Sequence, residues 1–310
     1  GGTAPCAPAV PQPPDRITVF FGGDNSCAAP LFGAIQSLLA NNPERSFAVH
    51  VATTGLDDAY RRRLADIAAR HGAEAWLHSV SGDMIEGLPI SDRISTASYC
   101  RLLMPKLLGP EVDRALYLDC DLIVSGDIGP LWRTDLGDAL VAAVADPGAD
   151  RSRRTALGLL PEHRYVNSGV LLANLAVWRR EGFAEQVVGF LRRFPHRIEY
   201  HDQDGINACL RGRVRYLSCV WNYMPYLSGT REHEEHPRIE SGELAPAIVH
   251  FAGTRKPWIE RLGDRWGEQY ERFARADGKG QLAIAPPRAA PAVTKSTCRR
   301  FCVVTGGRSG

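Results

Sequence analysis

The amino-acid sequence predicts an α/β protein with a mostly parallel, Rossmann-like sheet and helices on both faces. Short runs rich in β-branched and aromatic residues alternate with longer amphipathic segments, which is typical of repeated strand–helix–strand units. The length of 310 residues and the hydrophobic fraction of 44% fit one large domain of this class or two small ones. Polar clusters follow several strand-like runs, and in such sheets ligands bind beyond the carboxyl ends of the strands.

The elements are predicted in chain order from their periodicity. Short apolar runs predict strands over residues 17–21, 46–52, 75–80, 115–124 and 140–145. Apolar residues at helical spacing predict helices over residues 31–40, 56–71 and 95–108. The second helix has Asp57 and Asp58 in its first turn and Gly72 just after its end, as the helix dipole and C-cap geometry favour. Pro105 is expected to kink or end the third helix.

One folded domain is predicted over residues 16–275, between two terminal segments of different composition. Residues 1–15 are rich in Pro, Ala and Gly and lack a basic start with an apolar core, so we expect a disordered leader and no signal peptide. Residues 276–310 are expected to form a linker and a basic C-terminal tail. A basic–apolar tail of this kind can adsorb to anionic lipid, and a disordered basic tail is the alternative.

Composition excludes several classes. The formal net charge of +2 does not favour nucleic acid as a partner, and no apolar run reaches the roughly 20 residues that span a bilayer. Four of the eight cysteines lie in apolar runs and are expected to be buried thiols, which places the protein in the reducing cytoplasm: Cys100, Cys120, Cys209 and Cys219. Neither a Gly-rich dinucleotide motif nor a P-loop is present, which argues against a dehydrogenase or a P-loop kinase.

The most informative segment is the predicted strand over residues 115–124, which contains Asp119 and Asp121. Two buried carboxylates are costly to desolvate unless a cation pairs with them. Residues two apart in a strand point to the same face, so both side chains are expected to converge on one ion. Hard oxygen ligands suit Mg²⁺ or Mn²⁺, with substrate phosphates completing the shell. The pair therefore indicates a metal that holds a nucleotide diphosphate; a polar strand end facing solvent is the alternative.

Three polar clusters in the second half of the chain also carry candidate chemistry. An amide, a hydroxyl and a glycine precede an apolar run at 167–169, where a simple turn is the alternative. The segment 201–204 has the sequence HDQD ahead of a helix, and at least one of its acids is expected to serve as an N-cap. His250 ends a strand-like run and is followed by a basic loop with Gly253 and Lys256 that suits a diphosphate; a structural histidine is the alternative.

The order of these motifs resembles the retaining glycosyltransferase family that includes glycogenin and the bacterial lipooligosaccharide galactosyl- and glucosyltransferases. The resemblance is closest to the bacterial α-galactosyltransferases, especially around Asp119 and Lys256, and runs from about Ile17 to Trp266. The segments that carry it are VFFGGDN (19–25), SYCRL (98–102), LYLDCD (116–121), LWRTDL (131–136), VNSGVLL (166–172), HDQD (201–204), WNYMP (221–225) and HFAGTRKPW (250–258). It implies a glycosyltransferase A-type fold over residues 16–275 and a hexosyltransferase that uses a UDP-sugar.

The resemblance also assigns roles to individual positions. It implies that Mn²⁺, or Mg²⁺, binds Asp119, Asp121 and His250, bridges the diphosphate of a UDP-hexose and acts as a Lewis acid. The donor site that it implies comprises Phe21, Gly22, Asp24, Asn25, Cys120, Ser168, Gly169, Gly253 and Lys256. The sugar and its anomeric carbon would meet Arg101, Asn167, Asp202 and Gln203, and Asp146 would contact the acceptor.

An amide at Gln203 is a poor nucleophile, which favours front-face departure over a covalent intermediate, with the leaving phosphate as base. The acceptor implied is a saccharide or glycolipid of the lipopolysaccharide type, or another cell-surface glycan. A lipid-linked acceptor fits a cytoplasmic enzyme that touches the inner face of the membrane through its tail.

Two positions depart from the family pattern. Gly23 stands where close relatives often carry a second acid, and Ser26 where they often carry an aromatic residue. Both positions touch the nucleobase in the family, so they bear on uridine selectivity. A nucleotidyltransferase or other phosphotransfer enzyme on a similar sheet, and an inactive sugar-nucleotide-binding relative, remain the alternative functions.

Overall fold

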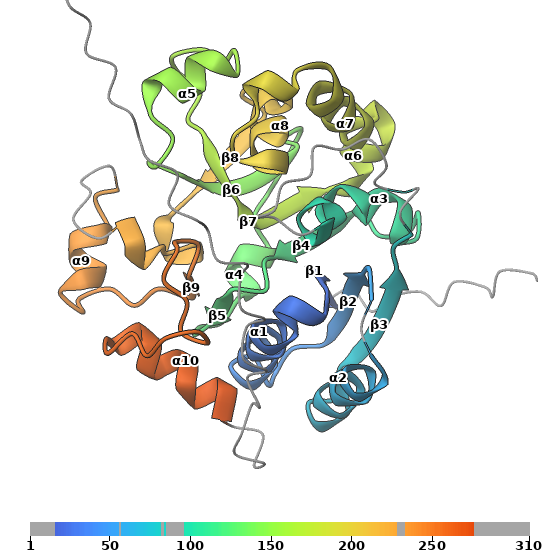
Figure 1. The fold of residues 1–310 in the computed structure, drawn as a ribbon, viewed down its shortest axis with the longest axis vertical. Coiled ribbons are helices and arrows are strands. Elements are labelled where there is room, and N and C mark those ends of the chain that lie inside the picture. The colour runs from blue at the N-terminus through green and yellow to red at the C-terminus, as the bar shows by residue number, and fades with distance from the viewer. Residues whose placement is uncertain (1–15, 56, 82–83, 85–95, 228–232, 276–310) are drawn as a thin grey trace, which may run out of the picture.

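A seven-stranded sheet forms the centre of the protein in the computed structural model, which describes residues 16–275 except 56, 82–83, 85–95 and 228–232 (Figure 1). In spatial order the strands are β3 (Glu74–Ser79), β2 (Phe47–Thr53), β1 (Ile17–Gly23), β4 (Arg114–Leu118), β7 (Val166–Asn174), β6 (Val141–Ala145) and β8 (Val214–Leu217). β7 runs antiparallel to both of its neighbours, whereas every other neighbouring pair in this sheet is parallel. The predicted mostly parallel sheet is therefore confirmed.

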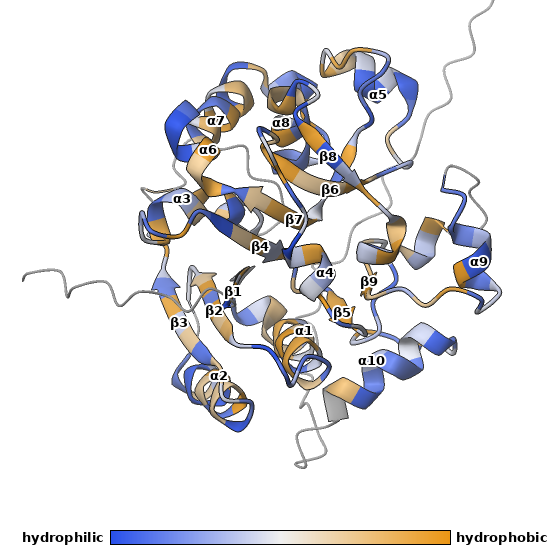
Figure 2. Ribbon diagram, turned by 180° about the vertical axis from the view of Figure 1, so that it is seen from behind, coloured by the Kyte–Doolittle hydropathy of each residue, from blue (hydrophilic) through white to orange (hydrophobic). Residues whose placement is uncertain are grey.

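Helices cover both faces of this sheet, because residues along each strand alternate between two hydrophobic cores. In β1, Val19 and Phe21 pack into the core beneath one pair of helices, α1 (Ala28–Ala40) and α2 (Asp58–Arg70). Phe20 packs into the core on the other face, beneath α6 (Leu175–Glu181), α7 (Phe183–Arg193) and α8 (His201–Leu210). Figure 2 shows apolar residues along the strands and polar residues on the outward sides of these helices.

A two-stranded antiparallel sheet of β5 (Leu122–Val124) and β9 (Ile248–His250) lies beside the main sheet. A third core joins this small sheet to α10 (Arg265–Arg275): Ile123, Val249 and Tyr270 are all buried in it. The remaining α-helices described are α3 (Met104–Leu107), α4 (Gly129–Trp132), α5 (Arg151–Ala156) and α9 (His236–Glu240). Because β9 ends at His250, this small sheet fixes the position of the histidine.

The prediction of one strand over residues 115–124 is wrong. β4 ends at Leu118, and β5 begins at Leu122 in the other sheet. The intervening residues are held from both sides, since Asp119 N–H donates to the carbonyl of Gly169 and Phe251 N–H donates to the carbonyl of Asp121, both at 2.8 Å. The two aspartates therefore lie on a turn between two sheets, and their convergence comes from that turn rather than from the side-chain alternation of a strand.

The helix predicted over residues 95–108 also differs from the structure. Residue 95 lies outside the described residues, and the rest forms a 3₁₀-helix, η3 (Thr96–Leu103), followed by the single-turn α3. Pro105 lies in the first turn of α3, where its missing N–H would have no intrahelical partner. It therefore begins a helix instead of ending one. The other predicted strands and helices agree with β1, β2, β3, β6, α1 and α2, with ends that differ by a few residues.

The terminal segments lie outside the described residues, so the leader over 1–15 and the basic tail over 276–310 stay predictions. Within the described part of the chain, every helix is too short or too polar to cross a membrane.

The pair His50 and His78 gives a pH-dependent prediction. Nδ1 of His50 lies 2.9 Å from Nε2 of His78, and its ring stacks on Trp76 with a centroid separation of 4.6 Å. Burial, with the charge of His78, lowers the pKa of His50 from 6.5 to about 3. The unfolded chain therefore takes up this proton first, so the stability that His50 contributes is complete above about pH 6.5 and is lost as the pH falls toward 3.

We expect the melting temperature of His50→Gln to fall less than that of the wild type between about pH 7.5 and pH 5. His196→Gln, an exposed histidine in the short 3₁₀-helix after α7, is the control and should retain the wild-type difference. Equal pH dependence in all three proteins would contradict the prediction.

Candidate active site

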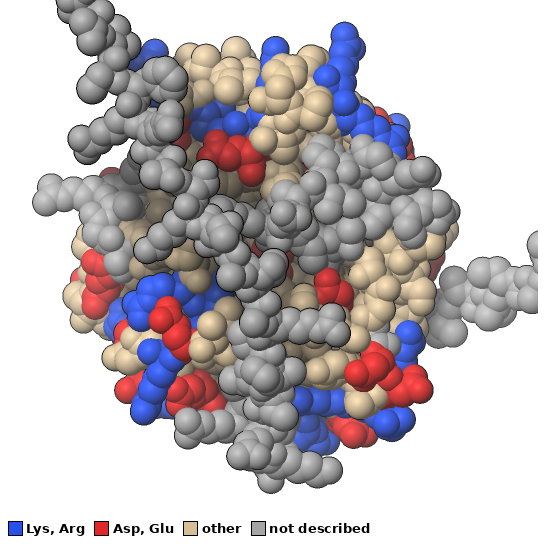
Figure 3. Space-filling model, viewed as in Figure 1, with Lys and Arg blue, Asp and Glu red and all other residues tan. Residues whose placement is uncertain are grey.

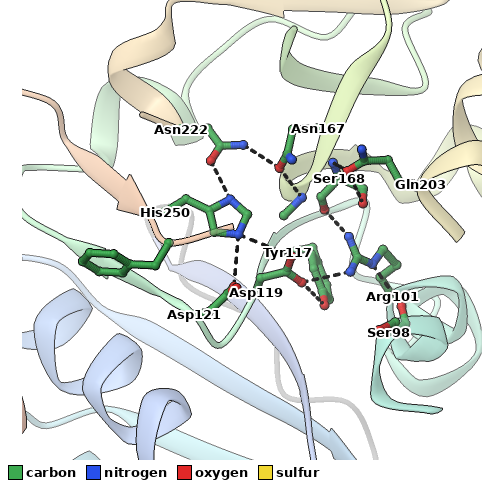
Figure 4. A network of polar contacts seen from close by, with 12 residues as sticks. Ser98, Arg101, Tyr117, Asp119, Asp121, Asn167, Ser168, Gln203, Asn222 and His250 are labelled. Carbon is green, nitrogen blue, oxygen red and sulfur yellow. Dashed lines mark hydrogen bonds and ion pairs between the residues drawn. The ribbon is translucent and has the colours of Figure 1, made fainter. Parts of the chain in front are cut away.

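Three side chains converge at the ends of β4 and β9. Asp119, Asp121 and His250 each present one ligand atom, and these atoms lie within 4.8 Å of one another (Figure 4). Nε2 of His250 lies 3.0 Å from Oδ1 of Asp121 and 3.8 Å from Oδ2 of Asp119. The structure thus brings together the three residues predicted as metal ligands, although His250, at the end of β9, is distant in sequence from the aspartate turn.

The histidine of this cluster is held in one tautomer by a buried amide. Asn222 donates from Nδ2 to Oδ1 of Asn167 at 2.9 Å, which leaves its own Oδ1 to accept from Nδ1 of His250 at 2.9 Å. The hydrogen-bond network assigns this amide orientation. With the proton on Nδ1, a neutral imidazole presents the Nε2 lone pair to the carboxylates. Two carboxylates and one such nitrogen form a donor set that fits a divalent cation.

Cations of the protein itself pair with the two carboxylates. Oδ1 of Asp119 accepts from the Tyr117 hydroxyl at 2.8 Å and from Arg101 at 2.9 Å. Oδ2 of Asp121 accepts from Nζ of Lys256 at 2.7 Å. Burial alone would raise the pKa of Asp121, but the Lys256 ammonium, and the His250 ring whenever it carries a proton on both nitrogens, hold it well below its usual range. Asp121 is therefore ionised, as a metal ligand must be.

Gly169 allows the cluster to pack closely. A Cβ atom on this residue would lie 2.7 Å from Oδ2 of Asp119 and still closer to Cε1 of His250. Contacts this short are sterically excluded, so the backbone of β7 approaches the cluster only because residue 169 has no side chain. The glycine predicted to line the donor site thus has a specific spatial role.

Arg101 and Asp202 form a buried charged group beside the cluster. The guanidinium lies over the Tyr117 ring, 4.4 Å from its centroid, and also donates to the Ser98 and Ser168 carbonyls. Oδ2 of Asp202 lies 2.8 Å from Nε of Arg101, but that N–H points at Ser98. Among the described residues this buried oxygen has no hydrogen-bond donor. Oδ2 of Asp202 is thus ion-paired with Arg101 but accepts no hydrogen bond within the described part of the chain.

The ionisation of Asp202 is shifted by its surroundings. Burial raises the pKa of this carboxyl to about 7; it outweighs the opposing charge of Arg101, and the charge of Asp119 adds a smaller increase. A hydrogen bond from a substrate hydroxyl would favour the ionised form.

Gln203 lies in a second network that joins the same site. Its Oε1 accepts from the Ser168 backbone N–H at 2.9 Å and from the Ser168 hydroxyl at 3.2 Å. Its Nε2 donates to Oδ2 of Asp146 at 3.3 Å, and Asn167 donates to the same oxygen at 3.1 Å. The amide of Gln203 is therefore fixed between the predicted sugar-binding residues and the predicted acceptor contact.

Four of the residues predicted to surround the nucleotide lie in β1 or directly after it. Asp24 caps the short 3₁₀-helix η1 (Asn25–Cys27) at the end of β1, and Asn25 accepts from the Asp57 backbone N–H at 3.2 Å. Gly22 and Phe21 lie fully within β1, and the Phe21 ring is 0% exposed in the core beneath α1. A ring buried in this way leaves only the backbone of Phe21 toward the end of β1, and its predicted donor contact stays a prediction.

The two remaining predicted donor-site residues pack against neighbours. Cys120 lies between the aspartates but packs against the core beneath α1, where the thiol of Cys27 and burial raise the pKa of its own thiol. Cys120 is a free thiol, as expected, and the residue is partly buried. Gly253 lies against Tyr226, since an added Cβ would come within 2.9 Å of the Cβ of that tyrosine.

Two residues of the networks were missed by the site prediction. Asn222 is 0% exposed and orients His250; it stands in the WNYMP segment (221–225), which carries the family resemblance, but no role was predicted for it. Tyr117 stands two residues before Asp119, near the end of β4, and its hydroxyl donates to Oδ1 of that aspartate.

One face of the molecule carries charges of both signs. On the part of this face formed by described residues, Figure 3 shows Lys and Arg side chains next to Asp and Glu side chains toward its edge. This mixture fits the formal net charge of +2 and contrasts with the continuous basic surface that a polyanion would need.

The chain is similar to known proteins over most of its length. The model of the family described as Glycosyl transferase family 8 matches residues 18–261. General stress protein A of Bacillus subtilis (strain 168) is 30% identical over 261 residues, which cover 80% of this chain and 89% of that protein. Lipopolysaccharide 1,3-galactosyltransferase of Salmonella typhimurium (strain LT2) is 27% identical over 255 residues, covering 79% and 73%. The crystal structure of galactosyltransferase LgtC in complex with donor and acceptor sugar analogs is similar with a TM-score of 0.74 and 28% identity, covering 84% and 96%.

Proposed function

The chain belongs to glycosyl transferase family 8, and we propose that it transfers galactose or glucose from a UDP-sugar to a saccharide acceptor with retention of configuration. Its fold is the glycosyltransferase A-type fold of LgtC, and the family match establishes a glycosyltransferase. The observation that carries the finer proposal is the continuity of two networks: the cluster of Asp119, Asp121 and His250 is joined through Asn222 and Asn167 to Gln203 and Asp146.

The metal of the proposed reaction is Mn²⁺, with Mg²⁺ as a substitute. Asp119, Asp121 and His250 would hold it, since their ligand atoms already converge and Nε2 of His250 presents its lone pair. A metal bound there would act as a Lewis acid toward the leaving diphosphate. Lys256, now paired with Asp121, carries a charge suited to the same diphosphate.

The donor sugar would lie between Asp202 and Gln203. Oδ2 of Asp202, which is ion-paired with Arg101 but accepts no hydrogen bond among the described residues, would accept from a sugar hydroxyl. The oxygen of Gln203 is engaged by Ser168, and an amide is a poor nucleophile. We therefore favour same-face transfer: the bond from the anomeric carbon to the β-phosphate breaks, the acceptor oxygen bonds to that carbon, and its proton passes to the departing phosphate.

The acceptor site would form around Asp146, between two exposed tyrosines. Tyr200 is 44% exposed and Tyr226 is 50% exposed, which is unusual for rings this large among the described residues. Burial of its hydroxyl end and the charge of Asp146 raise the pKa of Tyr226, so it remains a phenol. Aromatic faces that pack on sugar C–H groups, next to a carboxylate that accepts from hydroxyls, suit a saccharide.

We propose a lipopolysaccharide or other cell-surface glycan as the acceptor because lipopolysaccharide glucosyl- and galactosyltransferases are among the relatives. A cytoplasmic location with membrane contact through the tail over residues 276–310 belongs to the same proposal.

The proposal is tested by incubating the protein with Mn²⁺ and a panel of nucleotide sugars, with and without EDTA, and measuring the free nucleotide. Release of UDP from one UDP-hexose, abolished by EDTA, is expected. Turnover of nucleoside triphosphates instead would favour a nucleotidyltransferase. Donor binding without release, even with glycolipid extracts as acceptor, would favour an inactive relative.

A further inference from the structure

Asp204 lies one residue beyond Gln203 and is 0% exposed. Its Oδ1 accepts from the Tyr165 hydroxyl at 2.8 Å and from Nε of Arg153 at 3.1 Å. Its Oδ2 accepts from the backbone N–H groups of Glu199 at 2.7 Å and Tyr200 at 2.6 Å, and also from the Arg153 guanidinium. A carboxylate with this many donors and no exposure has no lone pair to attack a sugar, so Asp204 does not act as a nucleophile.

Arg153 connects Asp204 to the rest of this segment. It belongs to α5, which follows β6 and the Asp146 turn, and Asp150 caps that helix by accepting from the Arg153 backbone N–H at 2.8 Å. Its guanidinium also donates to the Arg197 carbonyl and lies over the Tyr200 ring, 5.9 Å from the centroid. Arg153 therefore links α5, which follows Asp146 in the chain, to the residues that lead into α8.

The chain between these contacts has a strained backbone. His201 adopts a φ of +48°, a left-handed conformation that a non-glycine residue rarely takes, at a cost of about 1 kcal/mol. The neighbouring Tyr200 holds this conformation in place. Its N–H donates to Asp204, and its carbonyl accepts from the Gln203 N–H at 3.1 Å. Asp202 and Gln203 follow this bend directly, so a relaxation at His201 would move both.

We propose that Arg153 and Asp204 are a positioning pair that maintains the bend at His201 and thereby fixes Asp202 and Gln203 against the donor sugar. The inference rests on the proposed function for its kinetic consequence, whereas the structural consequence is independent of it. Arg153 touches no residue of the Asp119–Asp121–His250 cluster among its described contacts, so the pair acts on transfer and not on nucleotide binding.

The variants Arg153→Met and Asp204→Asn, and their combination, test the pair. Each single change is expected to lower kcat for UDP release by about 10- to 100-fold, because small displacements of a reacting group cost this much. Affinity for UDP with Mn²⁺ should change less than about twofold, and the double variant should be no slower than the slower single variant. Arg153→Lys should recover part of the activity. Arg151→Met, an exposed arginine on the same helix, is the control.

Backbone hydrogen exchange gives a readout that does not require turnover. Peptides that cover residues 197–205 should exchange faster in Arg153→Met and Asp204→Asn than in the wild type or Arg151→Met, while peptides from β1 and β4 stay unchanged. Unchanged exchange in this segment, multiplicative kinetic effects, or a loss of UDP affinity in parallel with kcat would overturn the proposal. If the wild type releases no UDP from any donor, the proposed function fails, and the exchange result still decides whether the pair holds the bend.

Discussion

Asp119→Asn is expected to lower Mn²⁺-dependent UDP release by about 1,000-fold, since it weakens a ligand of the metal that stabilises charge on the leaving diphosphate. The amide introduced at position 119 would carry no charge, so the positive charge of Arg101 would be balanced by only one of its two carboxylate neighbours. Arg101 would then repel the incoming metal cation more strongly. His250→Ala should have an effect of the same order because it removes the only nitrogen of the cluster. The measurements are the rate of UDP release and the calorimetric affinity for Mn²⁺ in the presence of UDP.

Asp66→Asn provides the matched control for this change. Asp66 is exposed on α2, away from the cluster, so its variant should keep the wild-type rate and metal affinity. Circular dichroism and melting curves test whether Asp119→Asn and His250→Ala remain folded. Wild-type UDP release by either folded variant would show that Asp119 or His250 is not a ligand of the metal used in the reaction.

Local sequence patterns predicted the layers of the fold because the periods of strands and helices are local properties. Alternation in β1 and helical spacing in α1 and α2 depend on neighbouring residues, and these elements agree with prediction. The division of residues 115–124 depends on a partner far away in the chain, since β5 exists as a strand only through its pairing with β9. Nothing in the Leu122–Val124 run itself distinguishes it from a continuation of β4, so the turn at the aspartates could not be predicted from periodicity.

The same distinction separates the site residues that were predicted from those that were missed. Asp119, Asp121 and His250 carry chemistry that is unusual within apolar runs, so composition alone drew attention to them. Asn222 acts only through its contacts with Asn167 and His250, which the tertiary fold creates. A polar residue whose role is to orient another side chain has no local signature, whereas a ligand in an apolar strand end does.

Buried networks of this kind explain how the fold positions the site. β7 contributes Asn167, Ser168 and Gly169 from its first residues, and it is the strand that runs against its neighbours. Its amino end therefore lies at the same edge as the carboxyl end of β4, where the aspartate turn begins. A parallel strand in this place would have brought its carboxyl end there instead, so the reversed direction of β7 makes these three residues part of the site.

Gly169→Ala is the second change with a large expected effect. It adds a Cβ atom between β7 and the metal-ligand cluster, but it removes no ligand atom. The added Cβ would lie 2.7 Å from Oδ2 of Asp119 and closer to His250, and both neighbours are held by buried hydrogen bonds that limit their movement. We expect UDP release to fall by about 100-fold or more, because a displacement near 1 Å in a metal-binding site costs this much. The rate, the Mn²⁺ affinity and the melting temperature should be measured together.

Gly189→Ala in α7 separates this steric effect from the general effect of replacing glycine. Nothing lies within 4 Å of a Cβ added at Gly189, so the change should leave activity intact and stabilise the helix by up to ~1 kcal/mol. A Gly169→Ala variant that melts near the wild-type temperature but binds Mn²⁺ poorly would place the effect in the cluster itself. Retention of full activity in Gly169→Ala would mean that Asp119 and His250 move apart at little cost, and the preorganised cluster described above would then not be the form that binds the metal.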